Sequence, residues 1–140
     1  MNPFDLPVHP AVVHAPLAML VAAWVCVLLQ QRTGATVWGE RVRLFELIGV
    51  VALVPTIVAG FIDLRGFSVF TDPRWDQPLI WHSLAALLGA TLFTAHWVFR
   101  RASTDTSHGG AAALDVGLAT AGAWALLAAG AIAGEMVYAV

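Results

Sequence analysis

The sequence predicts an all-α integral membrane protein, a four-helix bundle with its N-terminus and C-terminus both on the outer side. The composition and the spacing of apolar stretches carry this prediction. Of the 140 residues, 59% are hydrophobic and only 11% are charged, whereas soluble domains contain roughly a quarter charged residues. Lipid is therefore the expected solvent, and residues 1–140 are expected to form a single transmembrane domain without a separate soluble domain.

Four apolar stretches are long enough to span a bilayer, which requires roughly 20 residues for about 30 Å of hydrocarbon. The expected spans cover residues 11–29, 45–64, 79–99 and 116–137. The segments between them contain most of the charged residues, together with the Gly and Pro residues that favour turns. The bundle should therefore lie almost entirely within the membrane.

The placement of arginine predicts the orientation of the bundle. Loops on the cytoplasmic side carry an excess of Lys and Arg. The first and third connections contain Arg32, Arg41, Arg43, Arg100 and Arg101, whereas the second contains Arg65 and Arg74. The first and third connections should therefore be cytoplasmic.

Charge and motifs exclude several functions. The net charge is -2 and the arginines are scattered over short loops, so nucleic acid is not an expected partner. Cys26 is the single cysteine, so the chain cannot build a disulfide or a Cys-x-x-Cys site. No hydrolase motif or phosphate-binding glycine loop occurs, and the sequence leaves open whether the protein is an enzyme.

The outer ends of all four expected spans carry ionisable residues. They are His9 and His14 on the first span, Asp63 on the second, His82 on the third and Glu135 on the fourth. Ionisable groups at membrane depth usually face the bundle interior, where they are paired or functional. The structural alternatives are interfacial charges, or a clasp in which carboxylates from the second and fourth spans hold histidines from the first and third.

The third span has a second feature, in which His82, Gly89 and His96 follow one another at intervals of seven residues. At about 100° per residue, these positions share one helix face. Imidazole can bind haem iron, and a small residue lets the macrocycle approach the backbone. This spacing resembles that of di-haem b-type cytochromes.

Only the outer haem of such a pair has a plausible second ligand. His82 can pair there with His14 or His9, whereas His96 has no histidine at matching depth. The polar residues at that inner depth are poor haem ligands: Gln30, Gln31, Glu46 and Asp115.

A family resemblance covers nearly the whole chain. The segment from His9 to Pro16 resembles the His-Pro-x-x-Val-His-Phe-Pro opening of a family of small predicted bacterial membrane proteins of unknown function, with Ala15 in place of phenylalanine. The likeness continues at Gly60–Asp63, His82 and Gly134–Tyr138. It implies a multi-pass protein of the bacterial inner membrane. Some members of this family are joined to iron-sulfur or cytochrome-type modules, which by analogy implies a role in electron transfer.

Three hypotheses of function follow. The first is electron transfer with haem b bound by His14 and His82. The second is a transition-metal ion site formed by His9, His14, Asp63, His82 and Glu135. The third is a non-catalytic subunit or assembly factor without a cofactor, whose Gly130–Gly134 face, a small-residue motif, packs closely against other helices. Beyond the lipid bilayer, the expected partners are a redox protein, a membrane complex or a second copy in a homo-oligomer.

Overall fold

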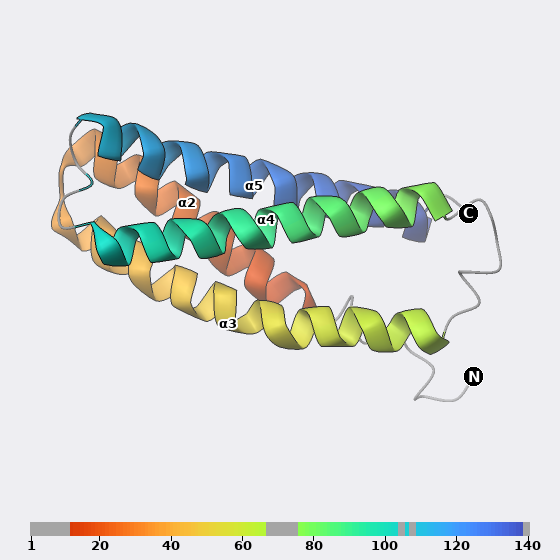
Figure 1. Cartoon of the computed structure of the whole chain (residues 1–140). Coiled ribbons are helices and arrows are strands. Elements are labelled where there is room, and N and C mark those ends of the chain that lie inside the picture. Colours follow the sequence, from red (N-terminus) through yellow and green to blue (C-terminus); the bar gives the residue numbers. More distant parts are fainter. Residues whose placement is uncertain (1–11, 67–75, 104–105, 107–108, 139–140) are drawn as a thin grey trace.

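The computed structural model describes residues 12–66, 76–103, 106 and 109–138, and the side chains of all of these except 63–66, 76 and 137–138. The described residues form four helices, all of which are long and apolar enough to cross a membrane. They are α2 (His14–Thr33), α3 (Thr36–Gly66), α4 (Asp76–Ala102) and α5 (Gly109–Tyr138) (Figure 1). The predicted all-α four-helix bundle is confirmed.

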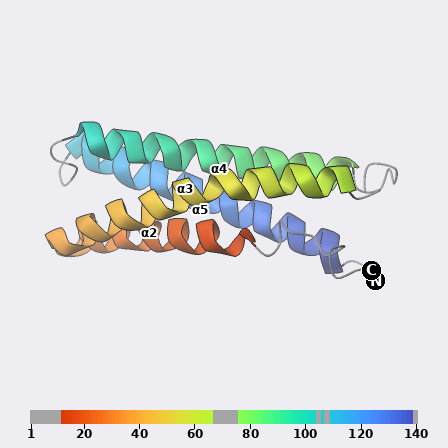
Figure 2. The same ribbon diagram turned by 90° about the horizontal axis from the view of Figure 1, so that it is seen from below.

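The helices are arranged as two antiparallel hairpins, α2 with α3 and α4 with α5. Both hairpin connections lie at one end of the bundle, and α2 begins and α5 ends near the other (Figure 1). Figure 2 shows α3 and α5 crossing the long axis of the bundle obliquely. We call the end with the two hairpin connections the inner end, because the arginine distribution predicts that it is cytoplasmic, and the opposite end the outer end.

The turn between α2 and α3 depends on Gly34. This residue has φ 67°, in the left-handed region that favours glycine, and its N–H donates to the carbonyl of Gln30 at 2.8 Å. This is a common way to end a helix. The chain therefore reverses within a few residues and α3 begins at Thr36.

The helices extend beyond the expected spans at the inner end. Helix α3 begins at Thr36 and α5 at Gly109, so most of the residues expected in the first and third connections are helical. Arginine and glutamate at the start of α3, and alanine and leucine at the start of α5, are good helix formers. Continuous helix places Glu46 and Asp115 in fixed positions on α3 and α5 instead of at the edges of loops.

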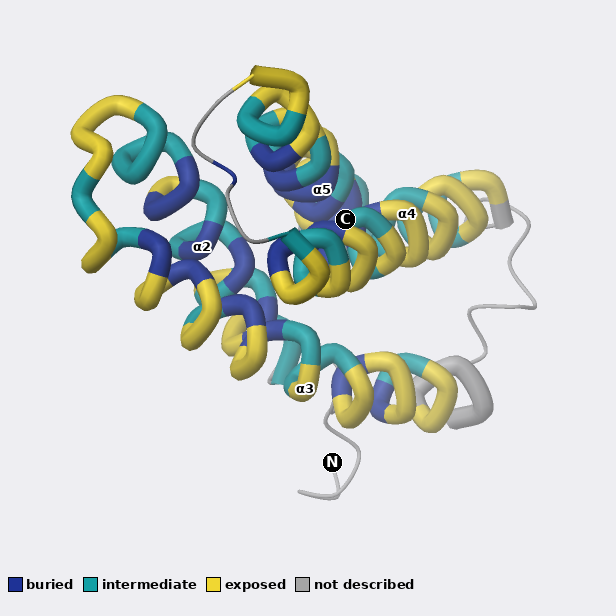
Figure 3. Tube along the Cα trace, turned by 60° about the vertical axis from the view of Figure 1, so that its left-hand side comes forward, coloured by how far each residue is buried: buried dark blue, intermediate teal, exposed yellow. Residues whose placement is uncertain are grey.

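Two apolar clusters form the core. The first contains Leu20, Phe93, Ala123 and Leu126, and the second contains Cys26, Val27, Val42 and Ala119. Buried and exposed residues alternate from turn to turn along α3, whereas on α4 the described residues before Gly89 are intermediate or exposed (Figure 3). Many exposed side chains on these helices are large and apolar, as expected for surfaces that contact lipid.

Glycines allow the helices to approach closely at three places. A Cβ built on Gly49 would lie 2.6 Å from Leu20 Cγ, one on Gly89 would lie 2.7 Å from Leu126 Cγ, and one on Gly122 would lie 2.9 Å from Phe93 Cδ2. A Cβ on Gly130 or Gly134 would meet no described atom within 4 Å. The close packing predicted for the Gly130–Gly134 motif is therefore not seen within the described bundle.

Candidate functional site

A cluster of buried polar side chains lies at the inner end of the bundle. Its charged and titratable members are Glu46 on α3, His96 and Arg100 on α4, and Asp115 on α5. Glu46, His96 and Asp115 are 0% exposed and Arg100 is 6% exposed. Helix α2 adds Gln30 and Gln31, both half-buried, so every helix contributes to what we call the inner polar cluster.

The imidazole of His96 lies between two carboxylates. Its Nδ1 is hydrogen-bonded to Oε1 of Glu46, and its Nε2 is hydrogen-bonded to Oδ1 of Asp115 at 3.0 Å. The two acceptors come from helices on either side of α4. His96 therefore links α3, α4 and α5 inside the bundle.

Arg100 and Gln31 complete the shell around Asp115. Nη1 of Arg100 donates to both carboxylate oxygens of Asp115, at 3.1 and 3.0 Å, and Nη2 donates to Oε1 of Gln30 at 2.6 Å. Nε2 of Gln31 donates to Oδ2 of Asp115 at 3.4 Å and to the carbonyl of Thr106 at 2.9 Å. Because Arg100 follows His96 by one helical turn, both side chains reach the same carboxylate.

Glu46 is held less firmly than Asp115. Its Oε1 accepts from His96, whereas its Oε2 is buried without a hydrogen bond to any described group. A buried carboxylate oxygen without a donor is costly. Glu46 is thus the acidic member of the cluster that can move without breaking several contacts.

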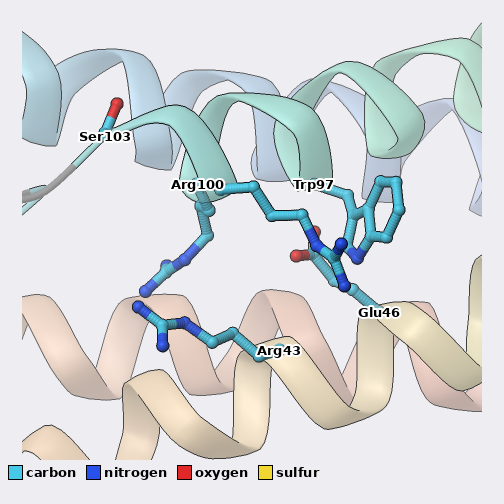
Figure 4. A pocket seen from close by; sticks show the side chains of 6 residues that line it. Arg43, Glu46, Trp97, Arg100 and Ser103 are labelled. Carbon is cyan, nitrogen blue, oxygen red and sulfur yellow. The ribbon is translucent and has the colours of Figure 1, made fainter.

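A cleft of about 390 Å³ opens beside the cluster, between α3 and α4. Figure 4 shows Arg43 from α3 and Arg100 from α4 extending into the same space. The guanidinium carbon of Arg101 lies 4.2 Å from the centroid of the Trp97 ring. The lining residues are Arg43, Glu46, Trp97, Arg100, Arg101 and Ser103.

The residues predicted to form an outer site are only partly described. His14, the first residue of α2, and Glu135 on α5 are both exposed. His82 on α4 is half-buried, and its Nδ1 donates to the carbonyl of Ala129 at 2.9 Å. His9 lies outside the described residues, as does the side chain of Asp63, whose backbone is near the end of α3.

The two inner positions of the predicted haem face have other contacts. Gly89 packs against the side chain of Leu126 and the carbonyl of Gly122, so no macrocycle fits against it in this arrangement. Both ring nitrogens of His96 are engaged by carboxylates. The structure therefore gives no support to an inner haem on α4.

The described side chains form no group of three His, Cys, Asp or Glu residues that could hold a metal ion. Glu46, His96 and Asp115 do not qualify because the two carboxylates contact opposite nitrogens of one ring. A metal ligand set must converge on one point. The predicted metal set includes His9 and Asp63, whose side chains the structure does not describe.

The inner polar cluster is not predicted from the sequence, in which Gln30, Gln31, Glu46 and Asp115 are identified only as poor haem ligands. The sequence does contain a signal for this cluster, because every helix carries a polar residue near its inner end. The clasp expected at the outer end, in which carboxylates from the second and fourth spans hold histidines from the first and third, stays a prediction. A comparable arrangement is found at the inner end, where carboxylates from α3 and α5 contact His96.

A family model described as a predicted membrane protein (DUF2231) matches residues 5–140. The chain belongs to this family. As a DUF2231 protein with four candidate spans, it is a multi-pass membrane protein. The expected membership in a family of uncharacterised membrane proteins is confirmed, whereas the cytochrome resemblance stays a prediction. The chain matches no curated protein and no solved structure.

Proposed function

We propose that this DUF2231 protein is a proton-carrying membrane subunit, in which the inner polar cluster takes up and releases one proton. The observation that supports the proposal is a fully buried imidazole with a carboxylate on each ring nitrogen. Ionisable residues inside membrane proteins frequently form proton relays.

The hydrogen bonds of His96 indicate how many protons the cluster holds. Each nitrogen-to-oxygen contact requires one proton, because neither an ionised carboxylate nor an imidazole lone pair can donate. Glu46, His96 and Asp115 must therefore share two protons in this arrangement. A neutral histidine flanked by two ionised carboxylates has only one proton to donate, so it can form only one of the two hydrogen bonds.

The charge balance favours the same state. With two shared protons, Glu46, His96 and Asp115 together carry a single negative charge, which Arg100 balances. Loss of one proton leaves one negative charge unbalanced in a site where charge is expensive. The charge balance thus supports a proton-loaded cluster in this arrangement, and the next event in the proposed cycle is proton release.

Glu46 provides the exchange path. Asp115 is fixed by Arg100, Gln31 and His96, whereas Glu46 has one hydrogen bond and lines the cleft. Toward the outer end lies the apolar cluster around Leu20 and Phe93. We propose that the proton moves between His96 and the inner surface through Glu46.

A subunit of this kind serves a membrane complex that consumes or releases protons at its inner face. We place that face in the cytoplasm of a bacterium, on the basis of the arginine distribution and the family resemblance. Reporter fusions after Thr33 and after Tyr138 test the orientation. The proposal requires the first fusion to report the cytoplasm and the second to report the opposite side.

The decisive experiment is nitrogen NMR on protein labelled with ¹⁵N-histidine, recorded over the pH range in which the fold persists. We expect one histidine with both ring nitrogens protonated, converting to a singly protonated ring as the pH rises. The signal should disappear in His96→Gln and remain in the control His14→Gln. A His96 ring that keeps one protonation state at every pH contradicts the proposal.

A second candidate function is electron transfer by haem b at the outer end, bound by His82 with His14 or His9. The hydrogen bond from Nδ1 of His82 to the carbonyl of Ala129 favours it, because ligating histidines commonly donate their second nitrogen to a carbonyl.

An absorption spectrum tests this second candidate. Protein purified in detergent after expression with haem precursor should show a sharp reduced band that is lost in His82→Ala. A colourless protein would remove the haem hypothesis. Elemental analysis of the same sample then tests the metal alternative, which predicts a stoichiometric transition-metal ion.

A further inference from the structure

The cleft beside the inner polar cluster lies at the depth where the lipid headgroups are expected. The candidate span of α4 ends at Ala102, and Arg101 and Ser103, which flank that residue, line the cleft. Trp97 lies one helical turn before Arg101, on the side of the bundle centre, and the guanidinium of Arg101 stacks over its ring. Tryptophan is enriched at this level of a membrane protein.

The cleft carries an excess of positive charge. Arg43 and Arg101 form no ion pair with any described side chain, whereas Arg100 is paired with Asp115. Glu46 is the acidic residue of the lining. Even with Glu46 and Asp115 both ionised and His96 neutral, the three arginines leave a net positive charge around the cleft.

We infer that this cleft binds a phosphate group, with Arg43 and Arg101 donating from opposite walls. A guanidinium presents two parallel N–H donors that match two oxygens of a phosphate. The volume of about 390 Å³ falls within the range of roughly 300–1,000 Å³ found for small-molecule sites. The phosphate can belong to a lipid headgroup or to a soluble ion, and the experiment separates these sources.

The test measures thermal unfolding of the full chain in a neutral detergent. One series adds phosphatidylglycerol and the other adds inorganic phosphate, each against chloride at equal ionic strength. A ligand that binds the folded state raises the unfolding temperature in a concentration-dependent way. We expect one of the two series to do so in the wild-type protein.

Arg43→Gln and Arg101→Gln each remove one guanidinium from the cleft, and Arg32→Gln removes one exposed arginine at the same end of the bundle. We expect each cleft variant to shift the titration to roughly tenfold higher ligand concentration, the effect of losing a charge-assisted hydrogen bond. The Arg32→Gln control should titrate like the wild type.

An effect from the lipid alone identifies a headgroup site, and an effect from inorganic phosphate alone identifies a site for a soluble ion. Equal titrations in the cleft variants and the control overturn the inference, as does the absence of stabilisation in both series. The outcome is independent of the proposed proton site, because Arg43 and Arg101 make no bond to the inner polar cluster and the ¹⁵N-histidine signals of both variants should match the wild type.

Discussion

Asp115 illustrates how a buried charge is accommodated at the level of single residues. Its carboxylate accepts hydrogen bonds from Gln31, His96 and Arg100 and is fully buried. A buried ion pair adds little net stability unless it is well hydrogen-bonded, because removing both charges from water costs free energy. Removing one partner, however, leaves the other charge buried without compensation. The contribution of Asp115 is therefore best measured by removing its charge while keeping its shape.

Asp115→Asn should destabilise the protein by about 3 kcal/mol, because Arg100 and the protonated His96 lose their shared counter-charge. Unfolding by denaturant in detergent micelles, followed by circular dichroism, measures the change. Glu135→Gln is the matched control at an exposed position, with an expected change of about 0.5 kcal/mol or less. Equal losses in the two variants would show that the inner polar cluster contributes no specific stability.

Arg100→Lys should lower the free energy of unfolding by about 1.5 kcal/mol although the charge is kept. Lysine has one nitrogen and cannot bond both oxygens of Asp115 and Oε1 of Gln30 in the arrangement that Arg100 adopts. Arg32→Lys, at an exposed position on α2, is the control for the same exchange. A stability change at Arg32 as large as that at Arg100 would contradict this reasoning.

The cluster could not be assembled from sequence because its members are brought together by helix rotation and helix length. Glu46 and Asp115 stood at the edges of predicted spans, where interfacial charges are common. The sequence of an apolar helix does not determine which of its faces packs against the neighbouring helix. His82 and His96 were recognised as sharing a face, since that follows from the period of one helix, but the partners of His96 come from two other helices.

At the level of helices, the close contact of α2 with α3 depends on Gly49. Leu20 is fully buried, and its side chain lies over Gly49 where a Cβ would be. Small residues that admit a neighbouring side chain are a common basis of helix association in membranes. The same arrangement is repeated in the other hairpin, where Leu126 covers Gly89.

Gly49→Ala should therefore lower stability by about 1 kcal/mol, since overpacking of about 1–3 kcal/mol exceeds the gain in helix propensity of about 1 kcal/mol. Gly130→Ala, a position with no described atom near the new Cβ, should show no loss. Denaturant unfolding of both variants in the same detergent provides the measurement. A stable Gly49→Ala protein would mean that Leu20 can move aside at little cost.

The helices themselves were predictable because a bilayer requires long apolar segments with all backbone groups bonded internally. Four such segments identified the number of helices and their antiparallel order. The charged residues between the expected spans favour loops, but the helices extend beyond these spans at the inner end. Helix α3 instead continues back to Thr36, since arginine and glutamate are compatible with a helix that projects beyond the hydrocarbon.

At the scale of the whole molecule, the described polar contacts between the two hairpins lie toward the inner end. They join Gln30 to Arg100, Gln31 to Asp115, Glu46 to His96 and Trp24 to Thr120, whose hydroxyl accepts from the indole at 3.1 Å. The next layer is apolar and contains Leu20 and Phe93. A proton held on His96 therefore meets a hydrocarbon-like barrier on the side of the outer end.

This barrier predicts that the protein alone does not conduct protons across a membrane. Proteoliposomes with an inside-negative potassium diffusion potential and an internal pH-sensitive dye should acidify at the rate of protein-free vesicles, whereas an added protonophore should make both acidify rapidly. The reason is that no described ionisable group lies within the apolar layer formed by Leu20, Phe93, Ala123 and Leu126. Proton flux that requires the protein and is abolished by His96→Gln would instead reveal a continuous path, and the cluster would then be part of a channel rather than a site that loads and unloads from the inner face.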